Sequence, residues 1–320
     1  MNFPPASSLP GVLHYVPPNL AVFEPSKALV RSLNINTLLW IGGLQDTFLS
    51  VAYPPLLAQA LPPTWSVAMA SLGSAGNSWG VGSIAQDAEE IAKIIAYLKQ
   101  NRPGGKVVIM GHSTGCQDCM EYLTGSKAAE YPPVEGVILQ APVSDREALE
   151  FHLPQEVMAE ANQLALLMCH EGKGSECMPT RITKPLFGKT AITAKRWVDI
   201  ASPPPDRSGA DDFFSSDTEI TRLQKTFGKI AHSAALLILF SGSEGNVSPS
   251  LDKETLVGKW TNVVHAAGGK VDEQYGGVVP GATHNLNGDP DAVVQDLLRR
   301  VAGYIGRLDA GDFTTAAARI

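Results

Sequence analysis

The residues best suited to chemistry lie in the pentapeptide Gly111-His112-Ser113-Thr114-Gly115, which follows an apolar run over 106–110 and precedes a helical pattern. In the pattern G-x-S-x-G, the serine occupies a strained turn between a strand and a helix, with its hydroxyl exposed at the sheet edge. The residues two positions away must then be small, and here both are glycine. The helix that follows offers backbone N–H groups and a positive dipole end to an oxyanion. We therefore predict that Ser113 is the nucleophile of an acyl transfer, the alternative being a plain glycine-rich turn.

A serine nucleophile needs a base, and the base needs a carboxylate to orient it. In chains with this elbow the order is serine, acid, histidine, each on a loop after a strand. Of the seven histidines, only His265 and His284 lie late enough to serve. His265 falls inside a helical stretch, whereas His284 lies on a loop before the last predicted helix. His284 is the predicted base.

Two loops offer a carboxylate for this base. Glu244 follows the apolar run over 236–240 directly and is the first choice. Asp145 follows the predicted strand over 134–139, and some enzymes with this arrangement draw the acid from that strand. The structural interpretation of Asp145 is a salt bridge or a helix cap. Asp252 is a third, weaker candidate.

An oxyanion intermediate needs two backbone donors. The first is expected from Thr114, the residue after the nucleophile, and the second from the loop over 42–45. Glycines in that loop let the backbone approach the substrate oxygen closely. Leu44 is the preferred second donor and Gly43 the alternative, unless the two glycines simply form a tight turn.

A second glycine-rich loop, over 73–82, lacks the spacing of a phosphate-binding loop. It is expected to form a wall of the substrate pocket, with Trp79 either pointing into the pocket or packed elsewhere. No pair of His or Cys has metal-ligand spacing with acidic neighbours. Neither a metal nor a cofactor is therefore expected.

Buried apolar runs alternate with amphipathic segments along most of the chain, which is typical of a mostly parallel sheet with helices on both faces. The predicted strands cover 37–41, 65–72, 106–110, 134–139 and 236–240. The predicted helices cover 54–60, 84–98, 116–123, 251–267 and 291–308. The elbow within this alternation indicates an α/β-hydrolase fold.

The alternation fails between residues 142 and 233, where helical segments over 155–169 and 192–200 surround no evident strand. We expect a core formed by 1–141 and 234–320, with 142–233 inserted as a helical lid. Substrate choice would then depend on the lid, whose aromatic residues pack either into the pocket wall or into the core. The candidates are Phe151, Trp197, Phe213 and Phe214.

Composition limits the partners. The 320 residues are 44% hydrophobic and 18% charged, with 25 Lys and Arg against 32 Asp and Glu, for a net charge of −7. No basic run stands out, so neither nucleic acid nor an anionic membrane is an expected partner. No apolar run reaches the roughly 18 residues of a membrane helix. The N-terminal segment has no signal-peptide pattern, and the chain has 4 cysteines, which favours the cytosol and leaves the oligomeric state open.

The segments 40–44, 111–118 and 138–147 resemble a fungal and plant α/β-hydrolase family that includes a siderophore esterase. The resemblance runs from about Leu13 to the end of the chain. It implies a serine esterase that opens the ester bonds of hydroxamate siderophores, fusarinine C and triacetylfusarinine C, to release iron in the cytosol. The alternatives are a carboxylesterase or thioesterase for another small acyl substrate, and a binding protein with an idle serine.

Overall fold

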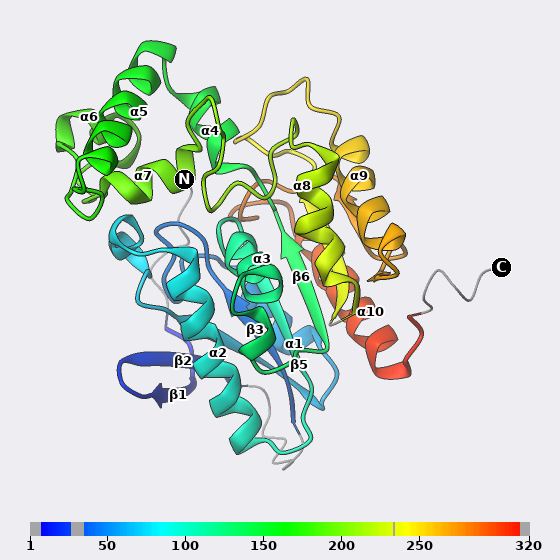
Figure 1. The fold of residues 1–320 in the computed structure, drawn as a ribbon. Helices are drawn as coiled ribbons and strands as arrows, with labels where there is room; N and C mark the ends of the chain where they lie inside the picture. The colour runs from blue at the N-terminus through cyan, green and yellow to red at the C-terminus, as the bar shows by residue number, and fades with distance from the viewer. Residues whose placement is uncertain (1–7, 27–34, 233, 314–320) are drawn as a thin grey trace.

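The computed structural model describes residues 8–26, 35–232 and 234–313, and they form a three-layer α/β fold (Figure 1). The sheet has nine strands in the order β1-β2-β4-β3-β5-β6-β7-β8, with β9 also paired to β7. The strands are β1 (Gly11–Val16), β2 (Leu20–Pro25), β3 (Asn36–Ile41), β4 (Trp65–Ser71), β5 (Val107–His112), β6 (Gly136–Gln140), β7 (Ala235–Ser241), β8 (Lys270–Val271) and β9 (Gly277–Val279). The pairings among β3 to β9 are all parallel, which confirms the predicted, mostly parallel sheet.

The helices fall into two groups, those that cover the sheet and those between β6 and β7. The first group is α1 (Tyr53–Ala60), α2 (Ile84–Asn101), α3 (Gly115–Thr124), α9 (Lys253–Ala266) and α10 (Asp291–Ala310). The second group is α4 (Asp145–His152), α5 (Gln155–His170), α6 (Thr180–Phe187), α7 (Ala194–Ala201) and α8 (Ile220–Lys225). Short 3-10 helices cover Gly76–Val81, Ala128–Glu130 and Phe227–His232. Within the described residues, no helix has the length and apolar character needed to cross a bilayer.

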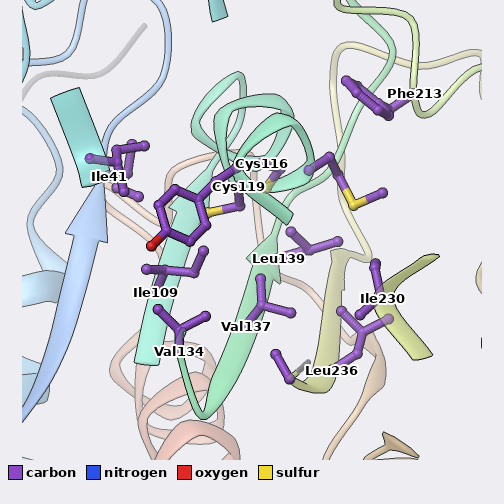
Figure 2. Packing of buried hydrophobic residues seen from close by; sticks show 14 of the residues in the cluster. Ile41, Ile109, Cys116, Cys119, Val134, Val137, Leu139, Phe213, Ile230 and Leu236 are labelled. Carbon is purple, nitrogen blue, oxygen red and sulfur yellow. The ribbon is translucent and has the colours of Figure 1, made fainter. Parts of the chain in front are cut away.

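The central strands are buried on both faces, which explains their continuous apolar runs. Along β3, Leu39 and Ile41 pack toward α2, α3 and α9, whereas Leu38 and Trp40 pack toward α1 and α10. This alternation is the period of two expected of a strand. Figure 2 shows part of the cluster that contains Ile41, where the reduced Cys116 and Cys119 of α3 lie among aliphatic side chains.

The segment between β6 and β7 has two parts that pack differently. Helices α5, α6 and α7 gather beyond the carboxyl ends of the strands (Figure 1) and share a hydrophobic cluster of their own with α4. The part that follows α7 packs instead on the core, because Leu223 and Phe227 join the cluster formed with α3 and α9. Among the described residues between β6 and β7, the only strand-like pairing is the bridge from Cys177 to Thr193.

The hairpin of β1 and β2 is absent from the predicted elements. It extends the sheet through the antiparallel pairing of β2 with β4. The outer strand β1 exposes Val12, Leu13 and Tyr15, so it lacks the alternation of apolar and polar residues by which a half-buried strand is recognised.

Candidate active site

Ser113 occupies the sharp turn between β5, which ends at His112, and α3, which begins at Gly115. Its φ of 54° is in the left-handed region, and its N–H donates to the carbonyl of Gln140 at 3.1 Å. A Cβ on Gly111 would lie 2.2 Å from the carbonyl oxygen of Gly115, and one on Gly115 would lie 2.4 Å from that of Ile41. Both flanking residues must therefore be glycine for the turn to form.

The structure brings Ser113, His284 and Glu244 together from three loops at the carboxyl ends of the strands. His284 Nε2 lies 2.8 Å from Ser113 Oγ, and His284 Nδ1 lies 2.7 Å from Glu244 Oε2. The second carboxylate oxygen, Glu244 Oε1, accepts hydrogen bonds from the backbone N–H and the side-chain amide of Asn246, at 3.0 and 2.9 Å. Glu244 is thus fixed at both oxygens, with one of them directed at the imidazole.

The other sequence candidates have different contacts. Asp145, the first residue of α4, accepts a hydrogen bond from Gln117 Nε2 at 3.0 Å. Asp252 caps α9 by accepting from the N–H of Thr255 at 2.9 Å. His265 lies on α9 with its Nε2 2.9 Å from the carboxylate of Glu273. None of the three has a hydrogen bond to Ser113 or His284 within the described residues.

The local charges keep His284 basic and its neighbour His112 neutral. Burial disfavours the His284 imidazolium, but the hydrogen bond and the charge of Glu244 outweigh it and raise the pKa of His284 above 6.5. Burial lowers the pKa of His112 to about 4, against the opposing charge of Asp46. The two rings lie 5.0 Å apart, so a neutral His112 places no positive charge beside the His284 imidazolium.

The activity is expected to decline on the acid side with a midpoint above pH 6.5. His284 can accept a proton from Ser113 only when it is neutral, and its pKa is raised from 6.5. Activity is therefore lost as the pH falls through this raised value. The measurement is kcat/KM against pH, which reports the free enzyme. A midpoint at or below 6.5 would contradict the assignment.

The loop after β3 approaches Ser113 closely. A Cβ on Gly43 would lie 2.6 Å from the Cβ of Ser113, so only glycine fits there. The N–H of Gly43 already donates to Asp46 Oδ2 at 2.8 Å. In contrast, the N–H groups of Leu44 and Thr114 have no hydrogen-bond partner within the described residues. This arrangement favours Leu44 over Gly43 as the second oxyanion donor.

The strained backbone of Ser113 leads to a stability prediction. A side chain in the left-handed region costs about 1–2 kcal/mol relative to glycine. We expect Ser113→Gly to have a free energy of unfolding about 1 kcal/mol above that of Ser113→Ala. Urea unfolding of the two variants provides the measurement. If the alanine variant is the more stable, the turn does not hold this residue at positive φ.

A cavity of about 690 Å³ opens at Ser113 and His284. On the side of the inserted helices, its lining includes the apolar residues Leu149, Leu186, Phe187 and Ile200 and the polar His152. Asp145 also lines the cavity. This volume lies within the roughly 300–1,000 Å³ of typical small-molecule sites.

None of the five aromatic residues predicted for the pocket wall is among the residues that line this cavity. Trp79 packs behind the wall, with its ring 4.7 Å from that of Phe187. Trp197 is buried in the same cluster, and Phe213 and Phe214 lie in the core cluster on the sheet. Phe151 points outward on α4 and is 47% exposed. For the four buried residues the correction has a physical reason, since large aromatic side chains gain most from burial among other apolar groups. Phe151 lies neither in the pocket wall nor in the core.

The wall residues Leu149, Leu186, Phe187 and Ile200 were missed by sequence reasoning. Their signal is the apolar side of each amphipathic helix in the segment between β6 and β7. That pattern shows which side is buried, but it does not tell whether the side meets a cavity or another helix.

The family model described as "Protein of unknown function (DUF1749)" matches residues 1–306. The chain belongs to the DUF1749 family. A relative of similar sequence is the fusarinine C esterase sidJ of Aspergillus fumigatus, 32% identical over 96% of this chain and 98% of that protein. Another is the esterase AN6793 of Emericella nidulans, 33% identical over 98% of this chain and 96% of that protein.

Among solved structures, the siderophore hydrolase EstB from Aspergillus fumigatus matches with a TM-score of 0.82 and 33% identity, over 95% of this chain and 99% of that one. Brefeldin A esterase, at 14% identity and a TM-score of 0.56, shares the fold alone. The resemblance seen in the sequence is confirmed, and this DUF1749 member is a carboxylic ester hydrolase of the siderophore esterase family with the α/β-hydrolase fold.

Proposed function

We propose that Ser113, His284 and Glu244 form a catalytic triad that hydrolyses ester bonds of fusarinine-type hydroxamate siderophores. The observation that carries the proposal is the continuous hydrogen-bond chain from Ser113 Oγ through both nitrogens of His284 to Glu244 Oε2. A nucleophile, a base and an orienting acid in this contact are the parts that serine acyl transfer requires.

In the proposed reaction, Ser113 Oγ attacks the ester carbonyl while His284 Nε2 accepts the hydroxyl proton. Glu244 holds the imidazole in the correct tautomer and stabilises the imidazolium. The N–H groups of Thr114 and Leu44 bind the oxyanion. His284 then gives its proton to the leaving alcohol, and an ester links the acyl group to Ser113. Water, activated by His284, hydrolyses this ester and restores the serine.

The substrate is inferred from relatives whose names state siderophore or fusarinine C hydrolysis, together with the cavity of about 690 Å³. Fusarinine-type siderophores are rings of hydroxyornithine–anhydromevalonyl units closed by ester bonds. Opening the ring lowers its denticity and weakens its hold on iron, which suits an enzyme of the cytosol. The segment 142–233 would act as the lid that selects the substrate, because it supplies the apolar wall.

The test compares ferric and iron-free fusarinine C, triacetylfusarinine C and simple p-nitrophenyl esters as substrates in parallel. We expect at least one fusarinine-type ester to be hydrolysed with a higher kcat/KM than the simple esters. A fluorophosphonate probe should also label Ser113, and peptide mass spectrometry would locate the labelled residue. An unlabelled serine would indicate a binding protein, and a preference for simple esters would indicate another carboxylesterase.

A further inference from the structure

A second, smaller cavity lies behind the proposed oxyanion donors. It has a volume of about 30 Å³, and its lining includes Gly43, Leu44 and Thr114. Leu44 and Asp46 line this cavity on one side and the catalytic cavity on the other. Since one water needs about 10–15 Å³ of such space, the cavity has room for about two.

Within the part of the chain that the structure describes, three polar atoms of the residues that line this cavity have no hydrogen-bond partner. They are Trp79 Nε1, Asp87 Oδ1 and Asp118 Oδ1. The side chains are almost fully buried, with relative exposures of 2% for Trp79 and 4% for each aspartate. Buried polar groups are rarely left unpaired in native proteins, and a cavity with donors and acceptors usually holds ordered water. One donor and two acceptors around a water-sized space meet that description.

The charges around the cavity favour water over a cation. Arg196 of α7 lines the cavity, and its guanidinium donates to the carbonyl of Trp79 at 3.1 Å and to Asp211 at 2.7 and 2.8 Å. This buried guanidinium already supplies positive charge. Burial also raises the pKa of Asp87 to about 7, although a hydrogen bond from Ser74 and the charge of Arg196 oppose the shift. A protonated carboxyl group can donate to water as well as accept from it.

We propose that about two ordered waters fill this cavity and that Trp79, Asp118 and Arg196 are positioning residues that hold the oxyanion donor Leu44 through them. The role in positioning rests on the proposed function. The helix α7 extends the effect to the substrate, because Ile200, one turn after Arg196, lines the catalytic cavity. Substrate that contacts Ile200 would therefore contact the same helix that places Arg196 in the small cavity.

The occupancy is tested by a high-resolution crystal structure of the ligand-free enzyme. We expect water density within hydrogen-bond distance of Trp79 Nε1, Asp87 Oδ1 and Asp118 Oδ1. A dry cavity, or one filled by a shift of these side chains, would overturn the water site. This readout does not depend on turnover, so it stays independent of whether Ser113 is the nucleophile.

The positioning role is tested by Trp79→Phe, with Trp260→Phe as the matched control. Trp260 Nε1 is also buried and has no partner among the described residues, but Trp260 lies in the core cluster and lines neither cavity. We expect Trp79→Phe to lower kcat about tenfold with KM within about twofold, since an oxyanion donor acts mainly in the transition state. The affinity of a boronate transition-state analogue should fall in parallel. Trp260→Phe should leave kcat and boronate affinity unchanged.

A purely structural effect would lower the melting temperature of both variants and leave the boronate affinity of the folded enzymes equal. That result, or an unchanged kcat in Trp79→Phe, would refute the positioning role. Asp118→Asn, which keeps the shape of the side chain, provides a second variant and should change kcat in the same direction. Activity retained in Ser113→Ala would instead count against the triad and leave the water site standing.

Discussion

Ser113→Ala is expected to lower kcat for fusarinine C and for a p-nitrophenyl ester by on the order of 10⁵- to 10⁶-fold. Its Oγ is the only hydroxyl within the described residues that lies in hydrogen-bond contact with His284, at 2.8 Å from Nε2. Without it no acyl-enzyme can form, although the oxyanion donors and the cavity remain. Steady-state kinetics with both substrates measure the loss.

The control for this variant is its folding. Alanine keeps the backbone of the elbow, so the melting temperature and the circular dichroism spectrum should stay close to those of the parent enzyme. Substantial hydrolysis of either ester by the folded variant would exclude Ser113 as the nucleophile. Loss of hydrolysis of the simple ester alone would mean that the siderophore is cleaved elsewhere.

Glu244→Gln should lower kcat by roughly 10³- to 10⁴-fold. A glutamine fits the same space, but it carries no charge to stabilise the imidazolium, and its amide permits the wrong tautomer of His284. The hydrogen bonds from Asn246 keep the side chain in place, so the protein should remain folded. The same variant should shift the acid limb of the pH profile to lower pH, because the charge that raises the pKa of His284 is gone.

Asp145→Asn distinguishes the two acids. Asp145 lines the cavity but has no hydrogen bond to His284, so its loss should cost less than about tenfold in kcat. Asp252→Ala removes the cap of α9 and should affect stability alone. If Asp145→Asn proved as damaging as Glu244→Gln, the acid would have to be reassigned.

The central sheet and the loops that follow its strands were predictable from the sequence. Strands buried on both faces, such as β5 and β7, require continuous apolar runs, and such runs are recognised directly in the sequence. In a parallel sheet the loops after such strands meet at one edge, so Ser113, Glu244 and His284 are expected to be close. The elbow added a steric signature of its own, since glycine is the only residue that fits at Gly111 and Gly115.

The rest depends on contacts that a linear pattern does not encode. Whether Leu44 or Gly43 supplies the oxyanion donor depends on Asp46, whose carboxylate already accepts from the N–H of Gly43. The pocket wall depends on which side of each inserted helix faces the cavity. An aromatic residue such as Trp197 could pack equally well against the cavity or against another helix, and it packs among the helices. The polar cavity at Asp87 and Asp118 joins α2 and α3 to α7, three helices that lie far apart along the chain.

The strands β6 and β7 are hydrogen-bonded neighbours, and Ala141 N–H donates to the carbonyl of Leu239 just where the chain leaves the sheet. Because the two strands are parallel, the chain leaves the sheet at the carboxyl end of β6 and re-enters it at the amino end of β7, beside Gly136. The return path, with Leu223 and Phe227, packs on the core, so only the part over α4 to α7, which has a cluster of its own, is suited to exchange between relatives. A chimera would have to keep Arg196 with its partners Trp79 and Asp211. It would then show whether these helices determine which ester is hydrolysed.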